Sequence, residues 1–341
     1  MRRVTVVAIL LALAISAGVS RTSARPAAQS GSDLLQFLPD GNGVLLIDVH
    51  RVTTSNLWNM ITSQDKVKTS LDKANSELTE MGVKLSDLQT VAVVFSANMN
   101  NPVIAVTGGF DQTDLLTKLR ANAKVKLTSE KYKNHDIYRV DSISTSVNKK
   151  EESKDAKTAA SGDKGAATVA AKEDGAFTFY DSKTVVVGSP EAVRSSIDTK
   201  AGAKASVAQN TKLTEGLAQN PAAAIRFAMN VTPAMTSGIQ ASQIPLPDFS
   251  SIKMIFGSVD VASGIDLIAT LRSDTAENAK NIADRLNGLL EMVRGYVSTM
   301  SNDPKMAVFA GALKTVSVTG SDVDVKISGN LPIEVLNQIM K

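Results

Sequence analysis

Residues 175–199 read GAFTFYDSKTVVVGSPEAVRSSIDT, and residues 314–340 read KTVSVTGSDVDVKISGNLPIEVLNQIM, so that one pattern occurs twice in this chain of 341 residues. In each stretch, two runs of alternating apolar residues flank a short polar turn, as a β-hairpin requires. A small polar residue and a proline follow, at Ser189-Pro190 and at Asn330-Leu331-Pro332. Because proline suits the first turn of a helix, both stretches predict a hairpin followed by a short helix.

A second block also recurs, ahead of the hairpins. Gly43–Ile61 matches Ala223–Ile239, since each begins as an apolar strand that ends in Val-Thr. The threonines, Thr53 and Thr232, are placed to cap a following helix, because a threonine side chain accepts hydrogen bonds from the first free N–H groups of a helix.

A third block lies between these two, in the same order in both halves. Thr90–Arg120 and Lys253–Leu286 each contain two strands and then a helix, which opens at Asp111 or at Asp274. Asp favours a helix start through capping and through the helix dipole. The fold class that follows is α+β, with two similar modules from internal duplication, each an antiparallel sheet with helices packed on one face. The alternative is that any protein of hairpins and amphipathic helices aligns loosely with itself, and the sequence leaves open whether the two sheets join.

The N-terminus has the pattern of a signal peptide, assigned to residues 1–24. Met1-Arg2-Arg3 is a basic start, Val4–Ala17 is an apolar region of suitable length, and small residues for cleavage follow at Ser16-Ala17-Gly18 or Thr22-Ser23-Ala24. The alternative is an uncleaved membrane anchor. That would need an apolar span of about 20 residues, and Ser20 and Arg21 interrupt this one. The expected location is therefore exported, periplasmic or extracellular.

The rest of the chain divides by composition and by the repeat. Residues 25–36 are assigned to a mature N-terminal linker, 37–200 to the first module, 201–221 to a connecting segment and 222–341 to the second module. Residues 142–175 within the first module are rich in Lys, Glu, Asp, Ala, Ser and Gly and contain no aromatic residue. Such a segment buries too little apolar surface to offset the entropy of ordering, so it is predicted to be a disordered insertion.

Charge and cysteine content exclude several classes of function. The formal charge is +3, and it falls to +1 without Arg2 and Arg3 and to 0 when cleavage after Ala24 also removes Arg21. A nearly neutral mature chain gives no electrostatic reason to expect nucleic acid as a partner. The absence of cysteine excludes disulfides, thiol nucleophiles, iron–sulfur clusters and thiolate zinc sites. We expect no cofactor, no metal and no membrane span after the signal peptide.

Two helices are predicted from apolar residues at helical spacing. In the first half this stripe comprises Val67, Leu71, Ala74, Leu78 and Met81. Gly82 follows it as a C-terminal cap. In the second half the stripe comprises Ile282, Leu286, Leu289, Leu290, Val293 and Val297. Both stripes are expected to pack on the protein's own sheet, and the alternative is a surface for a partner helix.

The residues that suggest chemistry form no complete site. Asp48 and His50 are two positions apart, so a strand would place them on one face, where a carboxylate could orient an imidazole. The only other histidine is His135, and no metal-binding spacing is present. We interpret the pair as a polar strand edge.

Three other motifs could in principle bind an ion or support catalysis. Gly108-Gly109 before the Asp111 helix could offer N–H groups to an anion, and a turn with positive φ explains the two glycines equally well. Asp322 and Asp324 provide too few oxygens for calcium. The spacing Ser-x-x-Lys, which on a helix would let lysine activate serine, occurs at Ser63/Lys66, Ser146/Lys149, Ser161/Lys164 and Ser250/Lys253.

Phe37-Leu38-Pro39-Asp40 precedes a Val-Leu-Leu-Ile-Asp strand, a later strand contains Tyr138, and Thr184–Ser196 reads TVVVGSPEAVRSS. In these features residues 37–200 resemble a family of uncharacterised exported bacterial proteins with a domain of unknown function. A "leucine-proline, strand, helix" start and a "valine-valine-glycine-serine-proline-glutamate-alanine" turn recur in that family. The resemblance implies an α+β fold and a place in the cell envelope. It implies no catalytic or binding residue, because none is established for such a family.

Three hypotheses of function follow. The first is a non-catalytic envelope protein that binds a partner protein or a small ligand through its sheet faces or through the groove between its halves. The second is a hydrolase with a site assembled from scattered Asp, Ser, Lys and Glu residues, and the third is an accessory protein anchored by an uncleaved signal peptide. The missing acid–base and nucleophile sets favour the first. Catalytic and binding residues stay unassigned at this point, and so does the oligomeric state.

Overall fold

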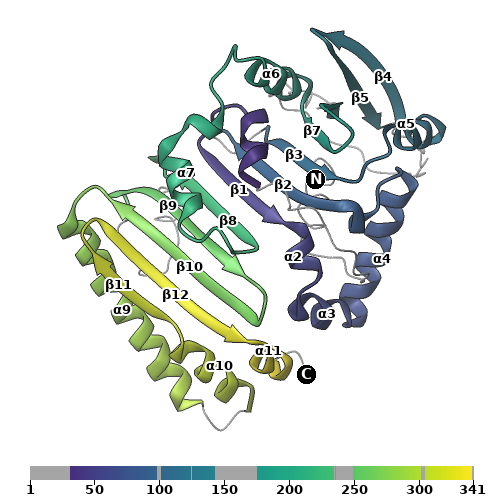
Figure 1. The fold of residues 1–341 in the computed structure, drawn as a ribbon. Helices are drawn as coiled ribbons and strands as arrows, with labels where there is room; N and C mark the ends of the chain where they lie inside the picture. Colours follow the sequence, from purple (N-terminus) through teal and green to yellow (C-terminus); the bar gives the residue numbers. More distant parts are fainter. Residues whose placement is uncertain are drawn as a thin grey trace, which may run out of the picture.

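One antiparallel sheet runs through the whole molecule (Figure 1). The computed structural model describes residues 31–97, 101–123, 125–142, 175–233, 235, 249–300 and 304–339. The expected signal peptide and nearly all of the expected insertion therefore lie outside the described residues. The mixed α+β class with a large antiparallel sheet, which the sequence predicts, is confirmed.

The strands, in chain order, are β1 (Gly43–Asp48), β2 (Leu88–Phe95), β3 (Val103–Gly108), β4 (Val125–Tyr132), β5 (His135–Ser142), β6 (Gly175–Phe179), β7 (Thr184–Gly188), β8 (Ile225–Asn230), β9 (Ile252–Asp260), β10 (Gly264–Ser273), β11 (Ser317–Ser321) and β12 (Asp324–Pro332). The α-helices are α2 (Val49–Thr53), α3 (Asn56–Thr62), α4 (Asp65–Glu80), α5 (Gln112–Ala121), α6 (Pro190–Lys200), α7 (Thr211–Ala218), α9 (Ala276–Thr299), α10 (Pro304–Lys314) and α11 (Ile333–Ile339). Three short 3₁₀ helices among the described residues are η1 (Gly31–Phe37), η2 (Leu85–Asp87) and η3 (Val207–Gln209).

The strand order repeats from the centre of the sheet outward. It is β1-β2-β3-β7-β6 on one side and β8-β9-β10-β12-β11 on the other, and β1 pairs with β8 in the middle. The hairpin β5-β4 extends the first side at its edge. Strands with the same place in the two orders come from blocks that match in the sequence. The repeat supports the internal duplication and the two modules that we propose, and the two halves of the sheet are continuous.

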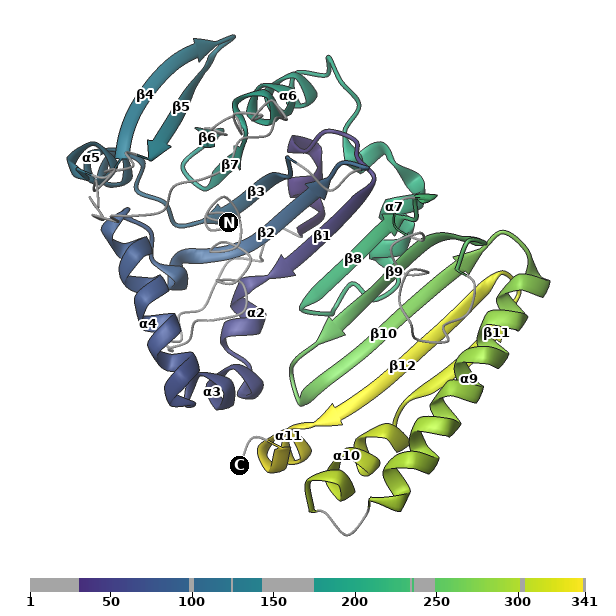
Figure 2. The same ribbon diagram turned by 180° about the vertical axis from the view of Figure 1, so that it is seen from behind.

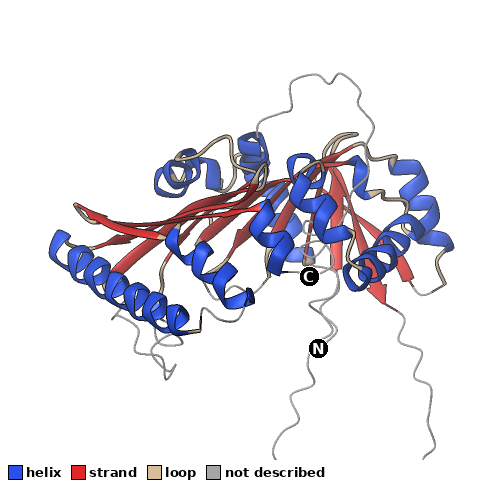
Figure 3. Ribbon diagram, turned by 90° about the horizontal axis from the view of Figure 1, so that it is seen from below, coloured by secondary structure: helices blue, strands red, loops and turns tan. Residues whose placement is uncertain are grey.

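Helices lie on both faces of the sheet (Figure 3). We call one side the α9 face, where α2–α5 and α9–α11 pack, and the other the η1 face, where η1, α6 and α7 pack. This differs from the expected cover on one face only. The central strands need helices on both faces of the sheet because the side chains on both of their faces are apolar. Val44 and Leu46 are buried on the η1 face, whereas Ile47 is buried on the α9 face.

Residues 31–36, which the sequence assigned to a linker, form most of η1. Leu34 and Leu35 are each only 2% exposed and pack on Val44 and Leu46 with the rest of the core of the η1 face. The linker assignment missed this element because a short 3₁₀ turn lacks the periodicity of a longer helix.

Ionic contacts hold the hairpin β4–β5 against α6. Asp198 Oδ1 accepts hydrogen bonds from Lys133 Nζ at 2.6 Å and from the Tyr132 hydroxyl at 3.0 Å. Glu130 accepts a hydrogen bond from Arg194 at 2.5 Å. The bond from Lys133 lowers the pKa of Asp198, and the bond from Arg194 lowers the pKa of Glu130. Both carboxylates are therefore stabilised in their charged forms.

Several helix ends are those that the sequence predicts. Asp111 caps α5 and Ser189 caps α6, each with its side chain accepting from a backbone N–H. Gly82 follows α4 with φ of 86°, and its N–H donates to the Thr79 carbonyl. Thr53 is a correction, because it ends α2 instead of capping a helix.

In the second half the helix starts differ from the expectation by a residue or more. Thr275, the neighbour of Asp274, caps α9. β12 continues through Asn330 to Pro332, because these residues still pair with Asp266 and Gly264 of β10. The proline therefore ends a strand, and α11 starts after it. The segment after Thr232 lies almost entirely outside the described residues.

Trp58 is the single tryptophan of the chain and is 2% exposed in the core of the α9 face. Trp58→Ala is expected to lower the free energy of unfolding by about 3–5 kcal/mol, because it leaves a large cavity. Asn59→Ala, on the exposed side of the same helix, is the control and should change it by less than about 0.5 kcal/mol. Urea unfolding followed by circular dichroism measures both. A loss below about 1 kcal/mol for Trp58→Ala would contradict this packing.

Acid should weaken the contact between the hairpin and α6. The folded pKa of Asp198 is lowered by its bond from Lys133, so its contribution to stability is present above the unfolded pKa of about 3.9. That contribution is lost as the pH falls through the lowered folded pKa. Asp198→Asn should therefore show a smaller loss of stability than the wild type between about pH 5 and pH 2. Lys133→Gln tests the pair from the other side, and identical acid profiles for all three proteins would refute the assignment.

Candidate binding site on the open face

Three strands at one end of the sheet have a helix on one side only. Val325 of β12 packs with Ala279 and Ile282 of α9 on the α9 face. On the opposite side, α7 covers β8 and β9 but, within the described residues, no helix covers β10, β12 and β11. Figure 3 shows the long helix α9 on one side of this end of the sheet. We call the uncovered η1-side surface of β10, β12 and β11 the open face.

Strand register places polar residues on the open face in cross-strand rows. In one row Thr270 of β10 is opposite Lys326 of β12, which is opposite Thr319 of β11. In the next row Arg272, Asp324 and Ser321 are opposite one another in the same way. Side chains directly opposite in an antiparallel pair lie close enough to interact. The six residues therefore form one continuous polar surface.

This surface is hollowed, with a volume of about 230 Å³. The two rows line its floor, and Phe256 and Gln219, the residue that ends α7, complete the lining. α7 lies close to the sheet because it carries Gly216, where a Cβ would lie 2.9 Å from the Phe256 side chain. The hollow is smaller than the roughly 300–1,000 Å³ clefts that bury drug-sized ligands, so its size suits a small molecule.

Arg272 and Asp324 are fixed by each other. The guanidinium donates from Nε to Oδ1 and from NH2 to Oδ2, both at 2.8 Å, which is a bidentate pair. Beneath it the Phe256 ring centroid is 5.2 Å from the guanidinium carbon. The hydrogen bond to Asp324 raises the pKa of Arg272, to which Glu215 of α7 also contributes. The pair uses two of the five N–H donors of the guanidinium and one lone-pair site on each oxygen of the carboxylate.

Lys326 and the hydroxyls of the hollow have no side-chain partner in the described part of the chain. Lys326 is exposed and makes no ion pair with a described residue. Thr270, Thr319 and Ser321 line the hollow and make no side-chain hydrogen bond to the residues described. Thr270 is 8% exposed, but its hydroxyl oxygen is not one of the buried atoms that lack a partner, so it is open to water or to a bound molecule.

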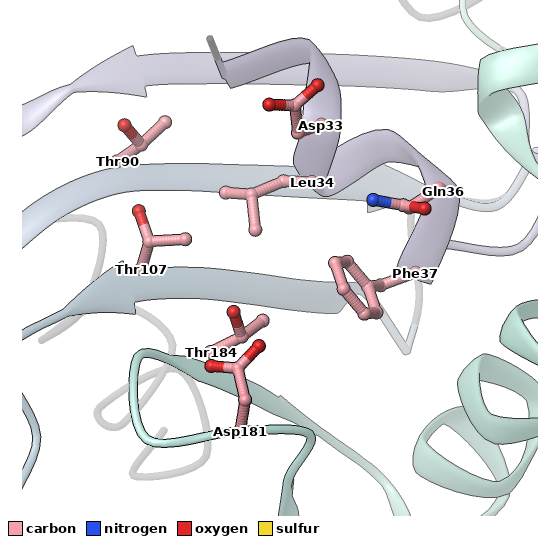
Figure 4. A pocket seen from close by; sticks show the side chains of 8 residues that line it. All are labelled: Asp33, Leu34, Gln36, Phe37, Thr90, Thr107, Asp181 and Thr184. Atoms are coloured by element: carbon pink, nitrogen blue, oxygen red, sulfur yellow. The ribbon is translucent and has the colours of Figure 1, made fainter. Parts of the chain in front are cut away.

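A second hollow lies under η1 and is much smaller, about 30 Å³ (Figure 4). Thr90, Thr107 and Thr184 stand in a row on β2, β3 and β7, and the carboxylates of Asp33 and Asp181 lie at opposite sides. Such a volume holds about one water molecule. The carboxylates do not converge on one point, so we assign this pocket to water.

Asp48 and His50, which we interpret from the sequence as a polar strand edge, do not lie on one strand. Asp48 ends β1 and caps α2, where its Oδ1 accepts from the Arg51 backbone N–H at 2.9 Å. His50 lies inside α2, so the two residues do not share a strand face. His135 is far along the chain at the start of β5, with its ring 4.9 Å from that of Tyr180.

The glycine pair and the aspartate pair are also used by the fold. The N–H of Gly108 donates to the Lys183 carbonyl and that of Gly109 to the Asp87 carbonyl, both at 2.9 Å, so neither is free for an anion. Neither glycine has positive φ. Gly108 is instead required by close approach, since a Cβ there would lie 2.6 Å from the Asp87 oxygen. Asp324 pairs with Arg272, as described.

The Ser-x-x-Lys pairs that fall in described residues do not lie within one helix. Ser63 ends α3 and donates to the Met60 carbonyl at 2.7 Å, whereas Lys66 belongs to α4. Lys253 is on β9 and pairs with Asp274 at 3.5 Å. The pairs at Ser146/Lys149 and Ser161/Lys164 lie outside the described residues.

The described residues contain no group of three or more His, Cys, Asp or Glu side chains placed to hold a metal ion. None of their helices is both long enough and apolar enough to cross a membrane. The hollow cannot be predicted from the sequence, because the residues that line it are brought together by strand register. Arg272 and Asp324, for example, are 52 positions apart in the chain.

Comparison with known proteins adds little. No family model matches the chain, and no curated protein matches it. Solved structures that match include crystal forms III, I and IV of a protein named TP0453, with TM-scores of 0.48, 0.45 and 0.43 and sequence identities of 11%, 11% and 10%. They cover 94%, 94% and 90% of this chain and 99%, 97% and 95% of their own. At this level of similarity the likeness carries no argument about function.

The unpartnered hydroxyl of Thr270 can be tested by stability. Thr270→Val should change the free energy of unfolding by less than about 0.5 kcal/mol. The matched control is Thr178→Val, since Thr178 is fully buried on β6 and donates to the Asp136 carbonyl at 2.9 Å. That variant should lose about 1 kcal/mol. Urea unfolding measures both, and equal losses would mean that the Thr270 hydroxyl has a structural partner.

Proposed function

We propose that the protein is a non-catalytic binding protein of the cell envelope and that it holds a small polar ligand in the hollow of the open face. The observation that carries this proposal is the hollow itself. The hollow has a volume of about 230 Å³ and a polar lining, and within the described residues no helix covers it. Its lining includes an ammonium group and hydroxyl groups that have no side-chain partner among those residues.

The chemistry of the lining supports binding more than catalysis. The only carboxylate of the hollow, Asp324, is held by Arg272 in a bidentate ion pair, and the lining contains no histidine and no second carboxylate that could complete an acid–base pair with it. Hydroxyls of Thr270, Thr319 and Ser321 have no imidazole beside them in the lining to activate them. The groups present bind and orient a ligand without transferring a proton.

Export is the second part of this proposal and rests on the sequence. The basic start and the apolar Val4–Ala17 region are typical of a signal peptide. In this setting the ligand is a molecule of the periplasm or of the medium. Analysis of the N-terminal residue of the protein purified from its host distinguishes a cleaved signal from an uncleaved anchor.

The binding role can be tested by filling the hollow. Thr319→Trp places a large side chain over the open face, and Thr128→Trp is the matched control, since both are exposed threonines on edge strands at opposite ends of one sheet. The tagged proteins are captured from the native envelope under mild conditions, and bound small molecules are identified by native mass spectrometry. We expect a ligand on the wild type and on Thr128→Trp but not on Thr319→Trp. A wild type without ligand, or a ligand retained by Thr319→Trp, would overturn the proposal.

A further inference from the structure

We infer that the ligand of the open face is a small hydroxylated monocarboxylate, such as a sugar acid, with its carboxylate at Lys326. This inference rests on the proposed function and names the class of molecule that fits the hollow. Four properties of the hollow support this class: the net charge of its lining, its free ammonium group, its hydroxyl groups and its volume.

The net charge of the lining predicts the sign of the charge on the ligand. The charged residues of the lining are Arg272, Asp324 and Lys326. Arg272 and Asp324 neutralise each other at 2.8 Å. Glu215 lies on α7 outside the lining, and its attraction acts on Arg272. Lys326 is thus the cation without a carboxylate partner in the described part of the chain, and it gives the lining a net charge of +1 that an anionic ligand would balance.

The kind of cation favours a carboxylate. The charge of the Arg272 guanidinium is already balanced by Asp324, with which it shares two hydrogen bonds. The free group is an ammonium, which acts as a compact point charge with three donors. A phosphate monoester carries about −1.5 to −2 at neutral pH, whereas one carboxylate carries a single charge. A monocarboxylate matches the single free cation.

The hydroxyl groups of the lining indicate the chemistry of the rest of the ligand. In the row of Lys326, Thr270 and Thr319 lie on the two neighbouring strands, directly opposite the lysine. Ser321 is in the next row, and the Gln219 amide forms part of the wall. A hydroxyl group both donates and accepts, so a ligand with several hydroxyls can bond to each of these groups. The Thr270 hydroxyl, which makes no side-chain hydrogen bond to the described residues, is one of them.

Aromatic stacking has no role in this recognition. The one aromatic side chain of the lining, Phe256, is 4% exposed, and its face is taken by Arg272. The volume of about 230 Å³ is below the range for drug-sized ligands. A single sugar ring or an open-chain sugar acid is therefore a better fit than an oligosaccharide or an aromatic acid.

The test uses three sugars of one size with different charges: D-glucuronate, D-glucose and D-glucose 6-phosphate. Each is titrated into the purified full chain, and the threonine methyl signals are followed by NMR. We expect saturable shifts at Thr270 and Thr319 with glucuronate and binding roughly tenfold or more weaker with glucose, which lacks the charge. Binding of glucose 6-phosphate should be weaker than that of glucuronate.

The variants locate the contact. Lys326→Gln should weaken glucuronate binding roughly tenfold or more, because it removes a charge-assisted hydrogen bond. The control is Lys131→Gln, another exposed lysine on a strand at the far end of the sheet, and it should bind as the wild type does. Thr270→Val should also weaken binding while the protein stays folded.

Three outcomes would overturn this inference: glucose binding as tightly as glucuronate, tighter binding of the phosphate, or an unchanged affinity in Lys326→Gln. Failure of all three sugars to bind would overturn it as well. The capture experiment on Thr319→Trp separates this failure from that of the proposed function. If the capture experiment finds an uncharged or phosphorylated molecule on the wild type but not on Thr319→Trp, the binding role is supported and the monocarboxylate is ruled out as the ligand.

Discussion

The pairing of β1 with β8 is the contact on which the rest of the structure depends. Leu46 lies opposite Arg226 and Val44 lies opposite Ala228, so the two halves of the chain share one hydrogen-bonded sheet. The junction removes the edges that two separate sheets would have exposed. It also places the most apolar strands at the centre, where both faces are covered. Figures 1 and 2 show β1 and β8 side by side between the two halves.

Cover decreases from that centre toward the second half. In the first half η1 and α6 lie on one face and α4 and α5 on the other. In the second half α9 packs along β11 at the edge (Figure 2) and also closes that edge, since Asn287 donates to the Val318 carbonyl at 3.2 Å and Arg294 to the Val316 carbonyl at 2.6 Å. Within the described residues, no helix covers the opposite face of the same strands. This uncovered surface is the one for which we propose a ligand.

The open face is stable without a ligand because of how its charges are arranged. Arg272 lies over Phe256 and is held by Asp324, so the surface that surrounds the hollow is already ordered. A preorganised surface loses less entropy on binding than a flexible one. Only Lys326 and the hydroxyls remain for the ligand.

The amino-acid sequence by itself determined the local structure and the order of the elements. Ser189, Asp111 and Gly82 mark helix ends where they were expected, because a cap depends on residues within one turn. The alternation of the strands and their repeated order could likewise be recognised in the sequence. The location in the cell envelope is also a prediction from sequence, and it stays one.

Only the tertiary structure decided which strands meet, which face stays open and which side chains share a site. Asp48 and His50, neighbours in sequence, were separated by the turn from β1 into α2. Arg272 and Asp324, 52 positions apart, were brought to 2.8 Å by the register of β10 and β12. Register depends on the packing of both faces of a sheet at once, and no short stretch of sequence contains that information.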